Sequence, residues 1–194
     1  MVRHGESTVN VAGTHIGGVS AHVPLTPLGV QQSQEAGRRL RDQGVRFAAA
    51  YVSTTRRAEQ TFAHMGLEGP DGILTAEAVE QSQGDWEGML KSGVYTHPAV
   101  VAAFAADDWG FRGGYVVKGE SKRETALRMW NLVECIRTRH GSGEVLLVTH
   151  GNAMRYMLAK MFDMHYKHFK FPNASATVIQ CSEHGQWSLE SFEQ

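Results

Sequence analysis

The feature that most constrains the fold is the alternation of short apolar segments with helical patterns along the chain. Residues 47–53 (FAAAYVS) and 144–150 (EVLLVTH) are apolar runs with polar or turn residues at their ends, which is typical of buried strands. Apolar or small residues at helical spacing follow each run: Ala58, Thr61, Phe62 and Met65 after the first, and Met154, Met157, Leu158 and Met161 after the second. Because helices that join parallel strands cover both faces of the sheet, we expect an α/β fold of three layers, α/β/α, with a mostly parallel central sheet.

Two longer helices carry their own start and stop signals. One is predicted over residues 27–43, because Thr26 can cap it, Pro27 suits its first turn and Gly44 suits its end. The other begins at Ser121-x-x-Glu124, a capping box, and its inner stripe is Ala126, Met129, Trp130, Val133 and Ile136. Residues 175–182 and 186–192 alternate like strands.

Polar residues follow three of the predicted strands at their carboxyl ends. His4 follows a first strand, Arg57 lies at the helix start after the second, and His150-Gly151 ends the run at 144–150. In open α/β sheets ligands bind at this rim, where helix N-termini favour anions. Only Met1 and Val2 precede Arg3, so the first strand is either short or lacks residues that precede Met1. The grouping indicates a phosphate site.

Composition excludes several other classes of function. The net charge is −1 and the sequence pI is about 6.8, so binding to nucleic acid by phosphate neutralisation is not expected. No apolar run approaches the length of a membrane span and no secretory signal is recognised, so we expect a cytoplasmic protein without a membrane partner. Cys135 and Cys181 are too few for a disulfide framework and are interpreted as buried thiols.

Five motifs occur in an order that resembles the histidine phosphatase superfamily, with its phosphoglycerate-mutase-like fold. They are VRHGES with Asn10, STTRRAEQT, EQSQGDWEG, GES and VTHGNAMR. The resemblance implies that His4 is the nucleophile that takes the phosphoryl group and that Glu80 is the proton donor to the leaving alcohol. It further implies that the residues around the phosphate are Arg3, Asn10, Arg57, His150 and Gly151.

The chemistry of these residue types agrees with those implied roles. A histidine attacks phosphorus only through an unprotonated nitrogen, so an acceptor must hold the proton on its other nitrogen. Guanidinium groups match the oxygens of a transferring phosphoryl group, which leaves no role that a metal ion or other cofactor must fill. A partly desolvated carboxyl near anionic oxygens can stay protonated and donate to the leaving group.

Alternatives remain open for the arginine, for the proton donor and for a pair of histidines. Arg56 adjoins Arg57 and could occupy its place in a shifted register, although the motif favours Arg57. Glu77 and Glu87 compete with Glu80 as the proton donor, and the spacing to GDWEG favours Glu80. His165 and His168 have helical spacing that a metal could use, but no nearby carboxylate motif supports this, and we interpret them as exposed.

The domain organisation and the substrate are the least constrained. We expect a single domain over residues 1–194 with a lid insertion over about 89–118 that faces the substrate. The lid is rich in aromatic residues, namely Tyr95, Phe104, Trp109, Phe111 and Tyr115, and its only basic residues are Lys91, Arg112 and Lys118. We interpret it as the wall of a pocket for a phosphate monoester with a partly apolar or mixed alcohol.

Three functions follow, in order of preference. The first is a metal-independent phosphatase that forms phosphohistidine on His4 and acts on a small-molecule phosphate monoester or a phosphoprotein. The second is a cofactor-dependent phosphoglycerate mutase, which needs more basic residues near the pocket to hold a second acidic group; Asn152 occurs in mutases too. The third is a non-catalytic module that binds a phospho-ligand. We expect a monomer or a homodimer.

Overall fold

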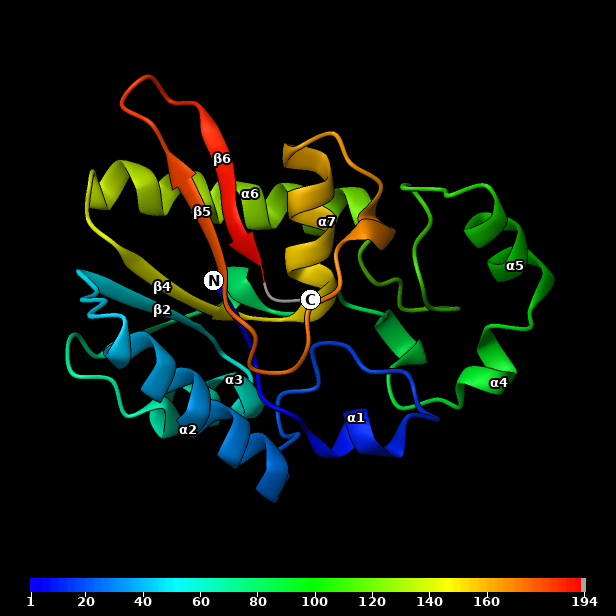
Figure 1. Cartoon of the computed structure of the whole chain (residues 1–194). Coiled ribbons are helices and arrows are strands. Elements are labelled where there is room, and N and C mark those ends of the chain that lie inside the picture. Colours follow the sequence, from blue (N-terminus) through cyan, green and yellow to red (C-terminus); the bar gives the residue numbers. More distant parts are fainter. Residues whose placement is uncertain (193–194) are drawn as a thin grey trace.

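A four-stranded parallel sheet forms the centre of the computed structural model, which describes residues 1–192 (Figure 1). Its strands are β1 (Val2–Arg3), β2 (Ala49–Ser53), β3 (Gly72–Thr75) and β4 (Val145–Thr149), in the spatial order β1-β4-β2-β3. The two strands predicted from apolar runs, β2 and β4, are the central pair and are buried along almost their whole length. The sequence did not indicate β3, because an edge strand with exposed Ile73 and Leu74 carries no apolar run.

Helices cover both faces of this sheet, so the predicted three-layer α/β/α fold is confirmed. The helices α2 (Pro27–Asp42) and α3 (Arg56–Met65) lie on one face, and α6 (Lys122–His140) and α7 (Gly151–Met161) lie on the other (Figure 1). Alternate residues of β2 divide between the two cores: Tyr51 packs in the cluster with α6 and α7, and Val52 packs in the cluster with α3.

Side-chain caps fix where the long helices begin. Thr26 Oγ1 accepts the N–H of Gly29 at 3.0 Å, which starts α2 at Pro27 as expected. At α6, Ser121 and Glu124 form the predicted capping box, with Glu124 Oε2 accepting the Ser121 N–H at 2.9 Å. Of the predicted inner stripe of α6 only Trp130 is not fully buried, and it stacks edge-on against Trp187 of the C-terminal hairpin.

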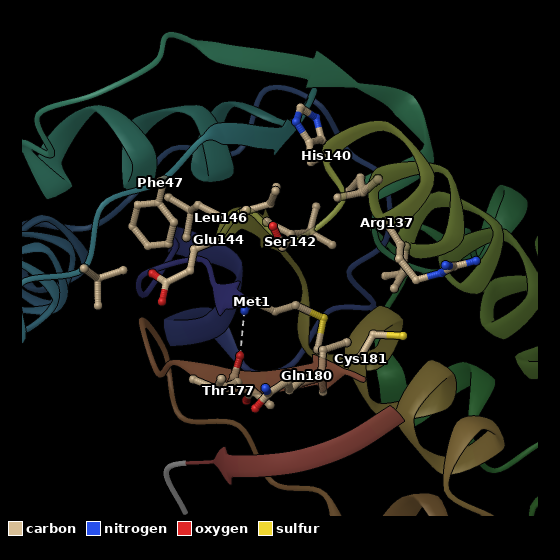
Figure 2. A pocket seen from close by; sticks show the side chains of 18 of the residues that line it. Met1, Phe47, Arg137, His140, Ser142, Glu144, Leu146, Thr177, Gln180 and Cys181 are labelled. Carbon is tan, nitrogen blue, oxygen red and sulfur yellow. Dashed lines mark hydrogen bonds between the residues drawn. The ribbon is translucent and has the colours of Figure 1, made fainter. Parts of the chain in front are cut away.

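The C-terminal hairpin joins the edge of the sheet at β1. It consists of β5 (Thr177–Cys181) and β6 (Trp187–Phe192), which pair antiparallel. Met1 N donates to Thr177 O at 2.6 Å, as Figure 2 shows, and Arg3 N donates to Ser175 O at 3.1 Å. A groove of about 770 Å³ lies beside this junction, between the amino ends of the central strands and β5, and none of the predicted site residues lines it.

The remaining segments surround the carboxyl ends of the strands. They are α1 (Thr8–Ala12), η1 (Ala76–Ala78), η2 (Gly84–Trp86), α4 (Lys91–Val94), α5 (Pro98–Ala105) and η3 (Tyr166–His168). The helices α4 and α5 stand to one side of the layered body (Figure 1). Val94 and Val100 from these helices form a separate small core with Ile16 and Trp86. None of the helices within residues 1–192 has both the length and the apolar character needed to cross a membrane.

Close contact between α2 and α3 depends on a glycine in the middle of α2. A Cβ built on Gly37 would lie 1.9 Å from the backbone oxygen of Met65 at the end of α3. Backbone atoms cannot rotate away from such a contact, so the two helices pack at this distance only because residue 37 has no side chain.

Gly37→Ala should therefore destabilise the protein, although alanine is the better helix former. We expect the free energy of unfolding in urea to fall by about 1–3 kcal/mol, because an added methyl group in a filled site forces the helices apart. Gly93→Ala is the matched control, since a Cβ there meets no atom within 4 Å. Equal stability of the two variants would contradict this account of the α2–α3 contact.

Candidate active site

Three parallel strands bring the predicted site residues to one cavity at their carboxyl ends. Arg3 ends β1 and His4 follows it, His150 and Gly151 follow β4, and Arg57 lies in the first turn of α3 after β2. The cavity has a volume of about 300 Å³, and its lining includes Arg3, His4, Asn10, Arg57, Glu80 and Gly151. His150 is completely buried beneath it, with its ring centroid 5.0 Å from that of His4. The structure thus brings together every residue that the sequence motifs singled out.

The side chain of His4 is held in one orientation by the backbone next to it. Its Nδ1 lies 2.7 Å from the carbonyl oxygen of Gly5, which can only accept, so Nδ1 carries the proton. The Gly5 N–H in turn donates to Thr61 Oγ1 at 2.9 Å. This arrangement leaves Nε2 of His4 with a free lone pair, as a nucleophile of this kind requires.

The tautomer of His150 is fixed by a cation on one side and a hydroxyl on the other. Arg57 Nη2 donates to His150 Nδ1 at 3.2 Å, and because a guanidinium cannot accept, Nδ1 is the unprotonated nitrogen. Nε2 therefore carries the hydrogen and donates to Ser53 Oγ at 2.8 Å. Burial lowers the pKa of both His4 and His150 well below the ordinary value, and the positive charges of Arg57 and Arg3 lower both further.

Arg3 and Arg57 keep donors that no residue within 1–192 uses. Arg57 donates to Ser20 O at 2.9 Å and to Gly18 O at 2.7 Å, and Arg3 donates to Phe171 O. Arg3 Nε is buried and has no hydrogen-bond partner within residues 1–192. Burial lowers the pKa of each arginine and Glu80 raises it, but a guanidinium remains charged in either case. Unused donors on cations of this kind suit an anionic ligand.

The candidates for the arginine and for the proton donor differ in whether they line the cavity. Arg57 is 5% exposed and lines the cavity, whereas Arg56 is exposed to solvent. Glu80 lines the cavity, whereas Glu77 is exposed and neither it nor Glu87 belongs to the lining. Glu80 Oε1 accepts from Gln81 N at 2.8 Å and Ala153 N at 2.9 Å, and Oε2 accepts from Asn152 N at 3.1 Å. The carboxylate is therefore held against the first turn of α7, next to His150 and Gly151.

Asn10 presents its amide nitrogen to the cavity. Its Oδ1 already accepts from Ser7 N and Ser7 Oγ, both at 2.9 Å, and from Asn173 Nδ2 at 3.3 Å. With the oxygen occupied in this way, the NH₂ group is the part of the side chain that remains for a ligand.

The cavity also contains polar residues that the sequence did not single out as site residues. They are Ser7, His15, Ser20, Gln81, Gln83, Lys91, Asn152 and Arg155. Asn152 and Arg155 lie on α7 just after Gly151, so a helix start at a strand's carboxyl end was the signal that could have found them. Lys91 begins α4, and the others belong to loops, where no periodic pattern indicates which side chain faces inward.

The expectation of an aromatic wall from residues 89–118 is wrong. Of the aromatic residues in that segment only Tyr95 lines the cavity. Phe111 and Tyr115 pack on Trp86, with ring centroids 6.1 and 5.5 Å away, while Trp109 packs on Tyr156 and Tyr166. Because these rings pack against other rings of the protein, they do not reach the cavity, and its lining is mainly polar.

The two histidines at helical spacing near the C-terminal part of the chain are exposed, as interpreted. His165 lies 3.6 Å from Asp107, and its ring stacks on Tyr166. Cys135 is also exposed and Cys181 is partly buried, so the interpretation of both cysteines as buried thiols is wrong. Across residues 1–192, no three or more His, Cys, Asp or Glu side chains are grouped so that they could hold a metal ion.

Comparison with known proteins finds relatives over the whole chain. Residues 1–194 match the histidine phosphatase superfamily (branch 1). A 2,3-bisphosphoglycerate-dependent phosphoglycerate mutase of Methylorubrum populi is 32% identical over 173 residues, which cover 81% of this chain and 76% of the mutase. A metal-independent phosphoserine phosphatase of Arabidopsis thaliana is 28% identical over 197 aligned residues, which cover 99% of this chain and 79% of the phosphatase.

The fold is shared with a solved structure as well. The phosphoserine phosphatase of Entamoeba histolytica in complex with phosphoserine superposes with a TM-score of 0.84, at 22% identity, over 98% of this chain and 93% of that one. The parallel sheet with helices on both faces is therefore an arrangement that the two chains have in common.

The two buried neutral imidazoles should make stability depend on pH. In the unfolded chain they titrate near the ordinary value of 6.5, but in the folded protein they stay neutral to much lower pH. Below pH 6.5 the unfolded chain thus binds more protons, so the free energy of unfolding should fall on acidification by up to about 1.4 kcal/mol per pH unit for each histidine.

Urea unfolding at about pH 7.5 and about pH 5.5 measures this loss. His4→Gln should reduce the difference between the two pH values, and His64→Gln, at an exposed position of α3, should leave it unchanged. A wild-type unfolding free energy that stays constant over this range would show that the pKa values of the two imidazoles are not lowered.

Proposed function

This chain belongs to the histidine phosphatase superfamily (branch 1), and we propose that it is a metal-independent phosphatase that hydrolyses phosphate monoesters. The reaction passes through phosphohistidine on His4, with Glu80 as the proton donor. One observation carries the proposal: His4, whose Nε2 keeps its lone pair, lines one cavity with Arg3 and Arg57, and its ring centroid lies 5.0 Å from that of His150.

The arrangement supports a two-step displacement. In the first step the lone pair of His4 Nε2 attacks phosphorus, the bond from phosphorus to the alcohol oxygen breaks, and that oxygen takes a proton from the Glu80 carboxyl. The imidazole then carries positive charge, which the Nδ1–H bond to Gly5 O stabilises. In the second step water attacks phosphorus, gives a proton to the Glu80 carboxylate, and the bond from phosphorus to Nε2 breaks.

Charge on the phosphoryl oxygens is balanced by groups that are already in place. Arg3 is half-buried and Arg57 is buried, and the interactions of such charges with a phosphate are stronger than in bulk solvent. The Asn10 NH₂ group supplies a neutral donor. Preorganised donors of this kind do not have to rearrange as the transition state forms, so the residues of the chain itself provide the stabilisation that a metal ion gives elsewhere.

Glu80 is suited to the proton donor role by where it is held. Hydrogen bonds from Asn152 N and Ala153 N fix it at the start of α7, close to the amide of Gly151 and to His150. The role is supported by this position in the wall of the cavity that would hold the phosphate.

The shape and polarity of the cavity favour a small, polar alcohol. About 300 Å³ must hold the phosphate and the group attached to it, and Gln81, Gln83 and Asn152 offer hydrogen bonds to that group. This replaces the partly apolar alcohol expected from the sequence. The phosphoserine phosphatase of Arabidopsis thaliana, whose sequence aligns with 99% of this chain, acts on a substrate of this size and polarity.

A phosphoglycerate mutase is the second candidate. Lys91 and Arg155 line the cavity in addition to Arg3 and Arg57, and the mutase of Methylorubrum populi is 32% identical. Each extra cation also binds within the chain, since Lys91 Nζ donates to Gly13 O at 2.7 Å and Arg155 Nε donates to Phe169 O at 2.9 Å, but each keeps further donors for a ligand. Isomerisation of 3-phosphoglycerate without release of inorganic phosphate would identify a mutase, and phosphate binding without turnover would identify a non-catalytic module.

Quenching with alkaline detergent during turnover should trap a phosphoryl group on His4. With ³²P-labelled phosphoserine as substrate and EDTA present, we expect acid-labile, base-stable label on the wild-type protein and none on His4→Ala. His15→Ala is the matched control, because His15 is a second imidazole of the cavity lining and its loss should leave the label in place. Full turnover by His4→Ala would refute the mechanism.

Glu80→Gln should slow the enzyme according to the leaving group. An alkyl phosphate needs a proton on its leaving oxygen, so its kcat should fall by about 10²–10⁴-fold, whereas p-nitrophenyl phosphate, with an acidic leaving group, should lose about tenfold or less. Exposed Glu77→Gln is the control and should retain activity on both substrates. An equal loss on the two substrates would remove Glu80 from the role of proton donor.

A further inference from the structure

The guanidinium of Arg57 is oriented by two backbone carbonyls of a neighbouring loop. Nη1 donates to Ser20 O at 2.9 Å and Nη2 donates to Gly18 O at 2.7 Å, so residues 18–20 determine the direction in which the planar group points. We call this segment the Gly18–Ser20 loop. It contains no helix or strand, and its carbonyls need a support of their own if they are to hold a cation in place.

Glu87 supplies that support. Its Oε1 accepts the Val19 N–H at 3.1 Å and its Oε2 accepts the Ser20 hydroxyl at 3.2 Å, so one carboxylate binds two residues of the loop. Oε1 also accepts the Gln83 N–H at 3.1 Å, which fixes the carboxylate to the turn that contains η2. Glu87 therefore joins the Gly18–Ser20 loop to the segment that follows the proton donor Glu80.

A glycine at position 18 makes this approach possible. A Cβ on Gly18 would lie 2.2 Å from Glu87 Oε1 and 2.3 Å from its carboxyl carbon. The side chain of Glu87 thus occupies the space that any other residue at position 18 would need. The fit between the two is a second observation, independent of the hydrogen bonds, that this carboxylate belongs against this loop.

Electrostatics acts in the same direction. Burial lowers the pKa of Arg57, and the negative charges of Glu80 and then Glu87 raise it. Glu87 thus helps to keep a charged guanidinium in a buried position without touching it through a hydrogen bond, and it leaves the donors of Arg57 to the loop carbonyls and to the cavity.

We propose that Glu87 is a positioning residue that sets Arg57 for phosphate binding by holding the carbonyls of Gly18 and Ser20. It acts only through Arg57 and does not touch the substrate. The proposal rests on the proposed function in one respect, namely that Arg57 binds a phosphate group.

The test uses substitutions at Glu87 and Gly18. For each variant, calorimetry measures the affinity for inorganic phosphate, and an activity assay measures kcat/KM for phosphoserine. Glu87→Ala should weaken phosphate binding and lower kcat/KM by about tenfold to a hundredfold, because a displaced guanidinium no longer meets the phosphate oxygens. Glu87→Gln keeps the shape and part of the hydrogen bonding, so it should recover part of the loss. Gly18→Ala should reproduce the effect of Glu87→Ala without altering the carboxylate itself.

The Arg57→Ala background separates positioning from a general effect on folding. In that background Glu87→Ala should cause no further loss of phosphate affinity or kcat/KM, because the group it positions is gone. An equal loss in both backgrounds would overturn the proposal, as would Glu87→Ala and Gly18→Ala proteins that bind phosphate within twofold of wild type. Phosphate binding is measured without turnover, so a chain that binds phosphate but fails to hydrolyse esters would refute the proposed function and not this one.

Discussion

The parallel pairing of β1 with β4 is the constraint on which the site depends. Val2 pairs with Val148 and Arg3 pairs with Thr149, and the ladder continues with His4 N donating to Thr149 O at 3.0 Å. Because parallel strands end at the same edge, the residues that follow them, His4 and His150, must lie side by side although 145 positions separate them in the sequence. A ladder shifted by one residue would turn one of the two side chains to the other face of the sheet.

Placing two imidazoles and two guanidinium groups so close together creates an electrostatic problem that the surrounding structure resolves. Both arginines remain charged, so protonation of either histidine would add positive charge to a buried site that already has two. Burial and this repulsion keep the histidines neutral, and the proposed attack by His4 Nε2 requires that neutrality. The same arrangement that excludes a proton attracts an anion, so the proposed ligand and the proposed reactivity of His4 have one physical cause.

The sequence predicted the site residues that lie at the ends of strands, and its motif also indicated Glu80. It did not indicate most of the other residues that loops bring to the cavity. Apolar runs placed β2 and β4, and therefore the residues after them, Arg57 and His150. The close contact of Glu87 with Gly18 and the cavity position of His15 depend on how loops far apart in sequence meet, which periodicity does not record. The aromatic residues of 89–118 misled for a related reason: Phe111 and Tyr115 face Trp86, a partner that no local pattern indicates.

The loop before Gly18 and the loop before α4 are hydrogen-bonded to each other, which connects the proposed alcohol pocket to the proposed phosphate site. His15 pairs with Leu90, Ile16 N donates to Met89 O at 2.8 Å, and Gly88 N donates to Ile16 O at 2.9 Å. The segment that leads to α4, which carries Lys91 and Tyr95 into the cavity, is thus joined by backbone hydrogen bonds to the segment that leads to the Gly18–Ser20 loop. A shift of α4 to fit a different alcohol would be transmitted to the carbonyls that orient Arg57. Changes of substrate within this architecture should therefore be confined to side chains on a fixed backbone between residues 14 and 20, because movement of that backbone would disturb Arg57, the group proposed to bind the phosphate.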